Sequence, residues 1–199
     1  MNLDFGPFLQ PVSAAARAER CAVRTLDRCT NALGLEEIPL PVPIEEWIEH
    51  PLGYEFGVED LSSIHEDAIG GSHIDERRIV IDPSVVAHDG RFRFTVAHEL
   101  GHMLMHADTK RRLKESISLR DAGNRRLERQ ADRFAAALLM PLKLVIRELF
   151  IIAEASRLDR LEMFSHLMAD SAESEWLWRT RVLPTITDRF GVSRAAAMN

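Results

Sequence analysis

Apolar residues recur every three to four positions along much of the chain, which is the spacing of one face of an α-helix. Residues 13–33 follow this pattern and end at Gly34, as helices often end at a glycine. Residues 91–106 repeat it without a proline, and residues 127–140 have an apolar face that is closed by Pro141. Further helices are predicted at about 44–48, 141–155, 158–169, 173–181 and 183–190. The chain is therefore predicted to be mostly helical.

Residues 54–82 depart from the helical pattern and contain short β-branched and aromatic runs that are typical of strands. The clearest strand is predicted at residues 77–82, where Pro83 stops it. Two further strands are predicted at 54–56 and 67–69, and a turn is predicted at 70–72. Together, these elements predict an α+β fold in which a small three- or four-stranded sheet packs on the helix at 91–106.

We expect a domain at residues 1–156 and a C-terminal helical segment at 157–199, which ends in the rhythm of a helix-turn-helix. In this rhythm Gly191 predicts a turn and Ser193 a helix N-cap. The helix that follows carries a single basic residue, Arg194. We therefore interpret the helix before Gly191 and the helix after Ser193 as two packed helices that close the domain, and we do not expect direct DNA binding.

The composition is sufficient for a real core, because 46% of the 199 residues are apolar. The apolar side chains that follow Pro141 are interpreted as core. They are Leu144, Leu149, Ile151, Ile152, Leu161, Phe164 and Leu167. Trp176 and Trp178 are also interpreted as core, with contact to a partner as the alternative.

The charge pattern narrows the class of protein. A net charge of −6 with mixed signs argues against a general affinity for nucleic acid or anionic membranes. There is no run of about 18 apolar residues and no signal-peptide pattern at the N-terminus. Cys21 and Cys29 would lie about 12 Å apart on one helix, too far for a disulfide. These features predict a cytoplasmic protein that does not bind membranes.

The strongest chemical signal is the run from His98 to His102, an H-E-x-x-H motif within the helix at 91–106. Residues four apart share one helix face, so the two imidazoles can bind one ion. Glu99 is turned by about 100° around the helix, where it can act as a general base instead of a ligand. Gly101 costs a helix about 1 kcal/mol, which is tolerable where another segment approaches closely. The alternative, a core helix with two hydrogen-bonded histidines, gives no role to the second motif.

That second motif supplies a third ligand, which a catalytic zinc site usually has. Glu128 and Asp132 lie one turn apart beside the apolar face of the helix at 127–140. We predict that Glu128 completes a His₂Glu ligand set and that Asp132 accepts the spare ring N–H of a ligand histidine. The alternative is an ordinary solvated charge pair, because Arg129 and Arg133 adjoin these acids.

His106 extends the same helix face, but it would lie about 12 Å from His98 along the helix axis, too far to share an ion with it. We interpret it as a histidine that ends the helix or contacts a ligand. The predicted ligand set suits zinc, and manganese or iron is compatible with it.

Peptide hydrolysis requires an extended substrate, and an exposed strand edge can hold one by main-chain pairing. We predict that the strand with Ile79, Val80 and Ile81 offers this edge beside the metal.

Residues 94–102 (FTVAHELGH), followed by residues 128–141 with their LLMP ending, resemble the ImmA/IrrE family of metallopeptidases. The likeness covers residues 40–141 well and the rest loosely. It implies that His98, His102 and Glu128 bind the metal and that Glu99 is the general base. It also implies a partner: members typically cleave a repressor with a helix-turn-helix DNA-binding domain, which releases genes of stress response or of mobile elements. The family often has Asn where this chain has Asp132.

We therefore predict a zinc-dependent metalloendopeptidase that cleaves an XRE-type helix-turn-helix repressor and so regulates transcription. Two alternatives remain open. One is a non-catalytic metal-binding regulator, in which Glu99→Gln would have no effect. The other is a toxin-like member of a toxin–antitoxin pair, which would arrest growth when expressed without its partner.

Overall fold

The computed structural model describes residues 14–62, 68–108 and 120–198. Helices dominate these residues, and one three-stranded sheet accompanies them, as the predicted α+β fold requires. The helices are α1 (Ala14–Leu33), α2 (Ile44–Glu49), α3 (Pro83–Val86), α4 (Asp89–Met105), α6 (Arg120–Leu139), α7 (Leu142–Ala155), α8 (Arg160–Met168), α9 (Ala172–Leu177), α10 (Leu183–Phe190) and α11 (Arg194–Met198). A π-helical turn, η2 (Trp178–Val182), joins α9 to α10, and the strands are β1 (Glu55–Val58), β2 (Gly70–His73) and β3 (Arg78–Ile81).

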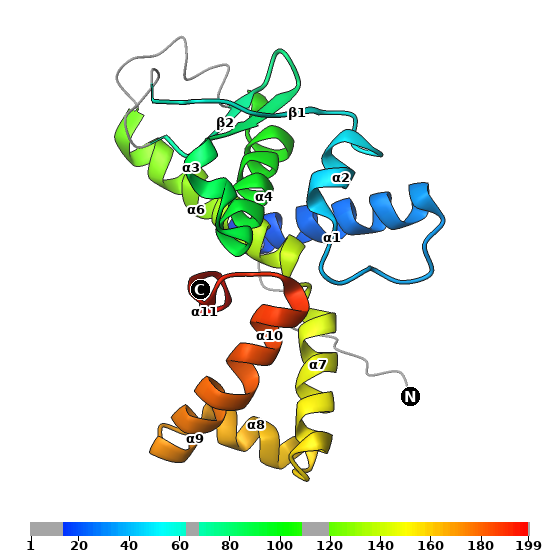
Figure 1. Cartoon of the computed structure of the whole chain (residues 1–199), viewed down its shortest axis with the longest axis vertical. Helices are drawn as coiled ribbons and strands as arrows, with labels where there is room; N and C mark the ends of the chain where they lie inside the picture. Colours follow the sequence, from blue (N-terminus) through cyan, green and yellow to red (C-terminus); the bar gives the residue numbers. More distant parts are fainter. Residues whose placement is uncertain (1–13, 63–67, 109–119, 199) are drawn as a thin grey trace.

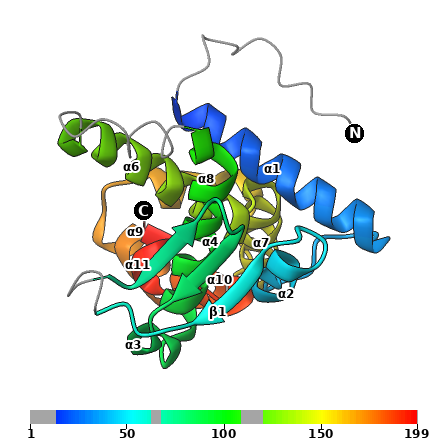
Figure 2. The same ribbon diagram turned by 90° about the horizontal axis from the view of Figure 1, so that it is seen from above.

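The elements form two bodies that meet at the start of α7 (Figure 1). The upper body contains α1, α2, α4, α6 and the sheet, and α7 to α10 extend away from it as the lower body. Seen from above, the sheet lies over α4, while α1 passes beside them (Figure 2).

The sheet corrects the predicted substrate edge. Strand β3 lies between β1 and β2, so that Val80 faces Gly57 in a parallel pair and Gly71 in an antiparallel pair. Ile79, Val80 and Ile81 are fully buried. The prediction that these three residues offer a free edge is wrong, because both sides of their strand are already paired. Their unbroken β-branched run is typical of a central strand.

Strand β2 is an edge of the described sheet, and it contacts α4. It occupies residues 70–73, where the sequence predicted a turn at 70–72. Of the strand predicted at 67–69, residue 67 lies outside the described residues, and the other two precede β2. Two glycines and a serine have little strand propensity of their own, so pairing with β3 is what makes this segment a strand.

The core of the upper body forms where α4 crosses α6. The apolar face predicted for α6 is buried, and it consists of Leu127, Ala131, Phe134, Ala135 and Leu138. Gly101 lies at the crossing: a Cβ atom there would be 3.0 Å from Cδ1 of Phe134 and 3.3 Å from Cα of Ala131. The glycine therefore allows the close approach of the two helices that carry the predicted metal ligands.

The C-terminal residues pack on the start of α4, as the interpretation of two packed helices requires. Gly191 ends α10 in the left-handed conformation, with φ of 60°, and the Ser193 hydroxyl accepts the amide N–H of Ala196 in α11. A Cβ atom on Gly90 would lie 2.4 Å from the backbone nitrogen of Ser193. Arg93 of α4 donates to the carbonyl oxygen of Gly191 and to the carboxylate of Glu45 in α2.

The lower body leaves several predicted core residues exposed. Leu161 is 79% exposed, Trp176 is 56% exposed and Ile151 is 50% exposed, so for these three the core prediction is wrong. Phe164, at 37% exposure, is a fourth residue for which the core prediction is wrong, whereas Leu144, Leu149 and Ile152 are buried. Apolar periodicity shows which face of a helix is apolar, but it does not show whether another element covers that face.

The structure also bears on the predictions about the two cysteines and about membrane-spanning segments. Cys21 and Cys29 are free thiols, and burial raises the pKa of Cys29 to about 11, so this thiol stays protonated at neutral pH. Among the described residues, no helix combines the length and apolar character needed to span a bilayer.

Candidate metal centre

Helix α4 presents His98 and His102 from one face, one turn apart. Their ring centroids are 4.8 Å apart, and their Nε2 atoms approach to 3.0 Å. The His102 side chain is buried, at 2% exposure, whereas that of His98 is 16% exposed. One imidazole is therefore fixed in the core and the other borders solvent.

Helix α6 brings the carboxylate of Glu128 to the same point. Its Oε2 atom lies 3.1 Å from Nε2 of His98 and 3.3 Å from Nε2 of His102. Tetrahedral zinc with bonds of about 2.0–2.2 Å holds its ligand atoms about 3.3–3.5 Å apart. The three atoms are thus spaced for one ion, and no other cluster of His, Cys, Asp or Glu side chains among the described residues has such spacing. Because the Glu128 side chain is 49% exposed, the cluster opens to solvent on that side.

The outer nitrogens of both imidazoles have partners. Nδ1 of His98 lies 2.9 Å from Oδ1 of Asp132, and Nδ1 of His102 lies 3.0 Å from Nδ1 of His106. If each Nδ1 carries the ring proton and donates it, each Nε2 presents a lone pair to the centre. Two lone pairs and the carboxylate oxygen of Glu128 then converge, and a cation satisfies all three. The residues present therefore fit a divalent metal of the zinc type.

Hydrogen bonds between the histidines and the carboxylates of α6 set the pKa values of this cluster when no metal is bound. Burial by itself lowers the pKa of His98, but hydrogen bonds with Asp132 and Glu128 outweigh it and raise the pKa to about 9. Hydrogen bonds with His102 and His98 hold the pKa of the Glu128 carboxyl far below its usual range. At neutral pH, protein stripped of metal therefore has a proton on His98, which a metal ion must displace.

Zinc affinity is accordingly expected to rise about tenfold per pH unit between about pH 6 and 8, because one proton leaves His98 for each ion bound. The rise should level off near the pKa of about 9, above which the free protein has already lost that proton. Competition with a chelator of known zinc affinity measures the profile, and calorimetry in buffers of different ionisation enthalpy counts the protons. A flat profile would contradict the arrangement.

Glu99 lies beside the cluster and is not part of it. Its side chain is buried, with 8% exposure, and its carboxylate interacts electrostatically with the His98 ring. Strand β2 covers it: a Cβ atom on Gly70 would lie 3.1 Å from both Cγ and Oε1 of Glu99 and 2.8 Å from Cγ2 of Thr95. The carboxylate is therefore held between α4 and the edge strand.

Gly70→Ala is expected to lower kcat/KM for peptide cleavage by about 10–100-fold, because the added methyl group must displace Glu99 or Thr95. Metal content should stay unchanged, since no predicted ligand touches Gly70. The matched control is Gly71→Ala, whose Cβ atom would make only an ordinary 3.4 Å contact with Val80. Steady-state kinetics and elemental analysis measure the two effects. Equal activity in both variants would show that Gly70 does not position Glu99.

The structure brings together the residues that the sequence nominated at this site, and it adds two. His106 ends α4 and contacts His102, as its interpretation requires. Gln130 of α6 contacts His106, and Gly70 contacts Glu99. No sequence signal marks Gln130, because a residue two positions after Glu128 on a helix is turned about 200° away from it. Gly70 was assigned to a turn, which concealed its contact with α4.

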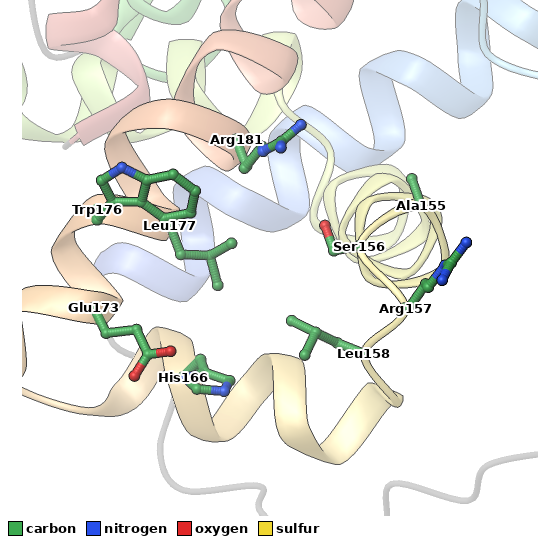
Figure 3. Close-up of a pocket in the computed structure, with 9 residues that line it drawn as sticks. All are labelled: Ala155, Ser156, Arg157, Leu158, His166, Glu173, Trp176, Leu177 and Arg181. Carbon is green, nitrogen blue, oxygen red and sulfur yellow. The ribbon is translucent and has the colours of Figure 1, made fainter.

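A separate pocket lies in the lower body (Figure 3). It opens between the junction of α7 with α8 and the helix α9, and Leu158, His166 and Leu177 are among its lining residues. None of the clustered metal-binding candidates lines it. The pocket is therefore distinct from the metal centre.

Comparison with solved structures finds a Mycobacterium tuberculosis transcriptional regulator, with 17% sequence identity and a TM-score of 0.49. The likeness covers 92% of this chain and 44% of that one, so the present chain spans less than half of the regulator's length. Comparison with curated proteins finds no match. A family model for the IrrE N-terminal-like domain, Peptidase M78, matches residues 54–199, which include α4, α6 and the whole histidine and carboxylate cluster. The chain belongs to this IrrE-like peptidase family.

Proposed function

We propose that this protein is a zinc-dependent endopeptidase that cleaves a helix-turn-helix repressor in the cytoplasm and thereby relieves repression. The observation that carries the proposal is the convergence of His98 Nε2, His102 Nε2 and Glu128 Oε2 on one point, with the buried carboxylate of Glu99 next to the His98 ring. Membership of a peptidase family supports the type of reaction.

In the proposed mechanism, His98, His102 and Glu128 hold the ion, and manganese or iron fits the same donors. When bound, the ion supplies Lewis acidity, which polarises the scissile carbonyl and lowers the pKa of a water molecule. Glu99 takes a proton from the attacking water and passes it to the leaving amine. Asp132 keeps the His98 ring in the orientation that turns Nε2 toward the centre.

Strand β2 is proposed to position the substrate, in place of the central strand that the sequence nominated. It is an edge strand of the described sheet, and it contacts α4 beside Glu99. A peptide that adds to this edge in extended form would place its backbone along the side of the cluster. The small residues Gly70, Gly71 and Ser72 leave space for the substrate's own side chains.

The repressor substrate rests on the likeness to ImmA/IrrE metallopeptidases. The direct test is incubation of the purified protein with the repressor encoded next to its gene, with zinc or with a chelator, followed by intact-mass spectrometry. We expect two fragments whose masses add up to the repressor plus one water, in the zinc sample alone. Cleavage that persists in the chelator, or an uncut repressor with zinc, manganese and iron in turn, would contradict the proposal.

A further inference from the structure

His106 is a buried histidine with no role in the proposed reaction. It ends α4 and is 2% exposed, although a buried polar ring is costly unless its nitrogens have partners. Nδ1 of His106 lies 3.0 Å from Nδ1 of His102, and Nε2 lies 3.0 Å from Oε1 of Gln130 in α6. Both ring nitrogens are therefore engaged, and neither faces the point where Glu128 converges with the ligand histidines.

The side-chain amide of Gln130 indicates which atoms donate in these hydrogen bonds. An amide oxygen only accepts, so Nε2 of His106 carries the ring proton and donates it to Gln130. An ion binds His102 only through an unprotonated Nε2, so in the metal-binding form Nδ1 of His106 is the acceptor between these two rings. The Nδ1–H of His102 must then donate to it, which leaves the lone pair of His102 Nε2 for the metal.

The reverse direction would be incompatible with metal binding. If Nδ1 of His106 were the donor, Nδ1 of His102 would accept and the proton of that ring would sit on Nε2. A protonated Nε2 cannot bind an ion. The orientation of the Gln130 side-chain amide, which reaches His102 only through His106, thus decides whether His102 can bind a metal ion.

We propose that His106 and Gln130 are positioning residues that hold His102 in its metal-binding tautomer through the chain His102–His106–Gln130. This inference rests on the metal site of the proposed function. It assigns the two ligand histidines different supports: a carboxylate, Asp132, holds His98, and a chain of two side chains, His106 and Gln130, holds His102. Helix α6 therefore supplies Glu128, Gln130 and Asp132 at every second position, and each contacts a histidine of the face that α4 presents.

Zinc affinity of paired variants tests the chain. Gln130→Leu and His106→Phe remove the acceptor and the ring nitrogens, and both are expected to weaken zinc binding about 10–100-fold. Gln130→Glu keeps an acceptor at the same place, so its affinity should stay within a few-fold of the unmodified protein. Arg133→Gln, an exposed change on the same helix, is the control for effects on α6 itself. Chelator competition measures affinity, and circular dichroism of the metal-free variants checks that they are folded.

If Gln130→Leu and His106→Phe do not fold, a second measurement tests the proposed hydrogen-bond chain in the unmodified protein. Long-range proton–nitrogen spectra of the zinc-loaded protein with isotope-labelled histidine report each ring's tautomer. We expect the proton of His106 on Nε2 and that of His102 on Nδ1. A proton on Nδ1 of His106 would overturn the chain, as would affinities of Gln130→Leu and His106→Phe equal to that of the control. If the unmodified protein binds no zinc at all, the proposed function fails instead.

Discussion

Glu99→Gln is expected to retain its full metal content and to lose repressor cleavage by about 10²–10⁴-fold, the usual contribution of a general base. The amide has nearly the shape of the carboxylate, so it fits the space that Gly70 and Thr95 leave beside α4. It cannot accept a proton from water, however. Because no ligand atom is removed, the cluster of His98, His102 and Glu128 should bind zinc as before.

Elemental analysis and kcat/KM measured on the same preparation separate the two effects. Gly71→Ala, on the strand that covers Glu99, is a suitable control for indirect disturbance of the site. Retained cleavage in Glu99→Gln would refute the base assignment. Loss of metal together with activity would show that Glu99 takes part in holding the ion.

Glu128→Ala is expected to lose most of its zinc, with a larger drop in affinity than the 10–100-fold typical of residues that only support a ligand. The change removes one of the three atoms that converge on the metal position and leaves two imidazoles, which do not make a catalytic zinc site. Cleavage should be lost with the metal. The fold should survive, because the Glu128 side chain is half-exposed and contributes little to the core.

Metal content after dialysis and chelator competition measure this loss. Glu154→Ala, which removes an exposed carboxylate from α7, is the matched control and should bind zinc normally. Asp132→Ala should fall between the two, because it removes the partner of His98 and leaves all three ligand atoms in place. If Glu128→Ala retained zinc like the control, the third ligand would lie elsewhere.

The sequence predicts which side chains come together, because the two segments that carry His98, His102 and Glu128 are both helical. Helical spacing alone places His98 and His102 on one face, and the same spacing places Glu128 beside the apolar face of α6. The two faces meet because both are buried against each other, and Gly101 marks the point of closest approach. The helical spacing of the residues therefore predicts both the faces of α4 and α6 and the contact between those faces.

The sheet is less predictable because its strands depend on partners distant in sequence. Residues 79–81 are apolar whether their strand is central or at an edge, and only the pairing of β1 and β2 around β3 decides this. Gly70 reads as part of a turn until β3 pairs with it. Gln130 has the same difficulty, because its contact with His106 depends on the angle at which α6 crosses α4. Such contacts follow from tertiary geometry and not from spacing.

We propose that α4 and α6 hold one divalent ion between them. An anomalous difference map from a crystal grown with zinc, recorded at the zinc absorption edge, tests it most directly. We expect one strong peak about 2.0–2.2 Å from Nε2 of His98, Nε2 of His102 and Oε2 of Glu128. A peak elsewhere, or imidazoles turned away from Glu128 in the presence of ample zinc, would contradict it.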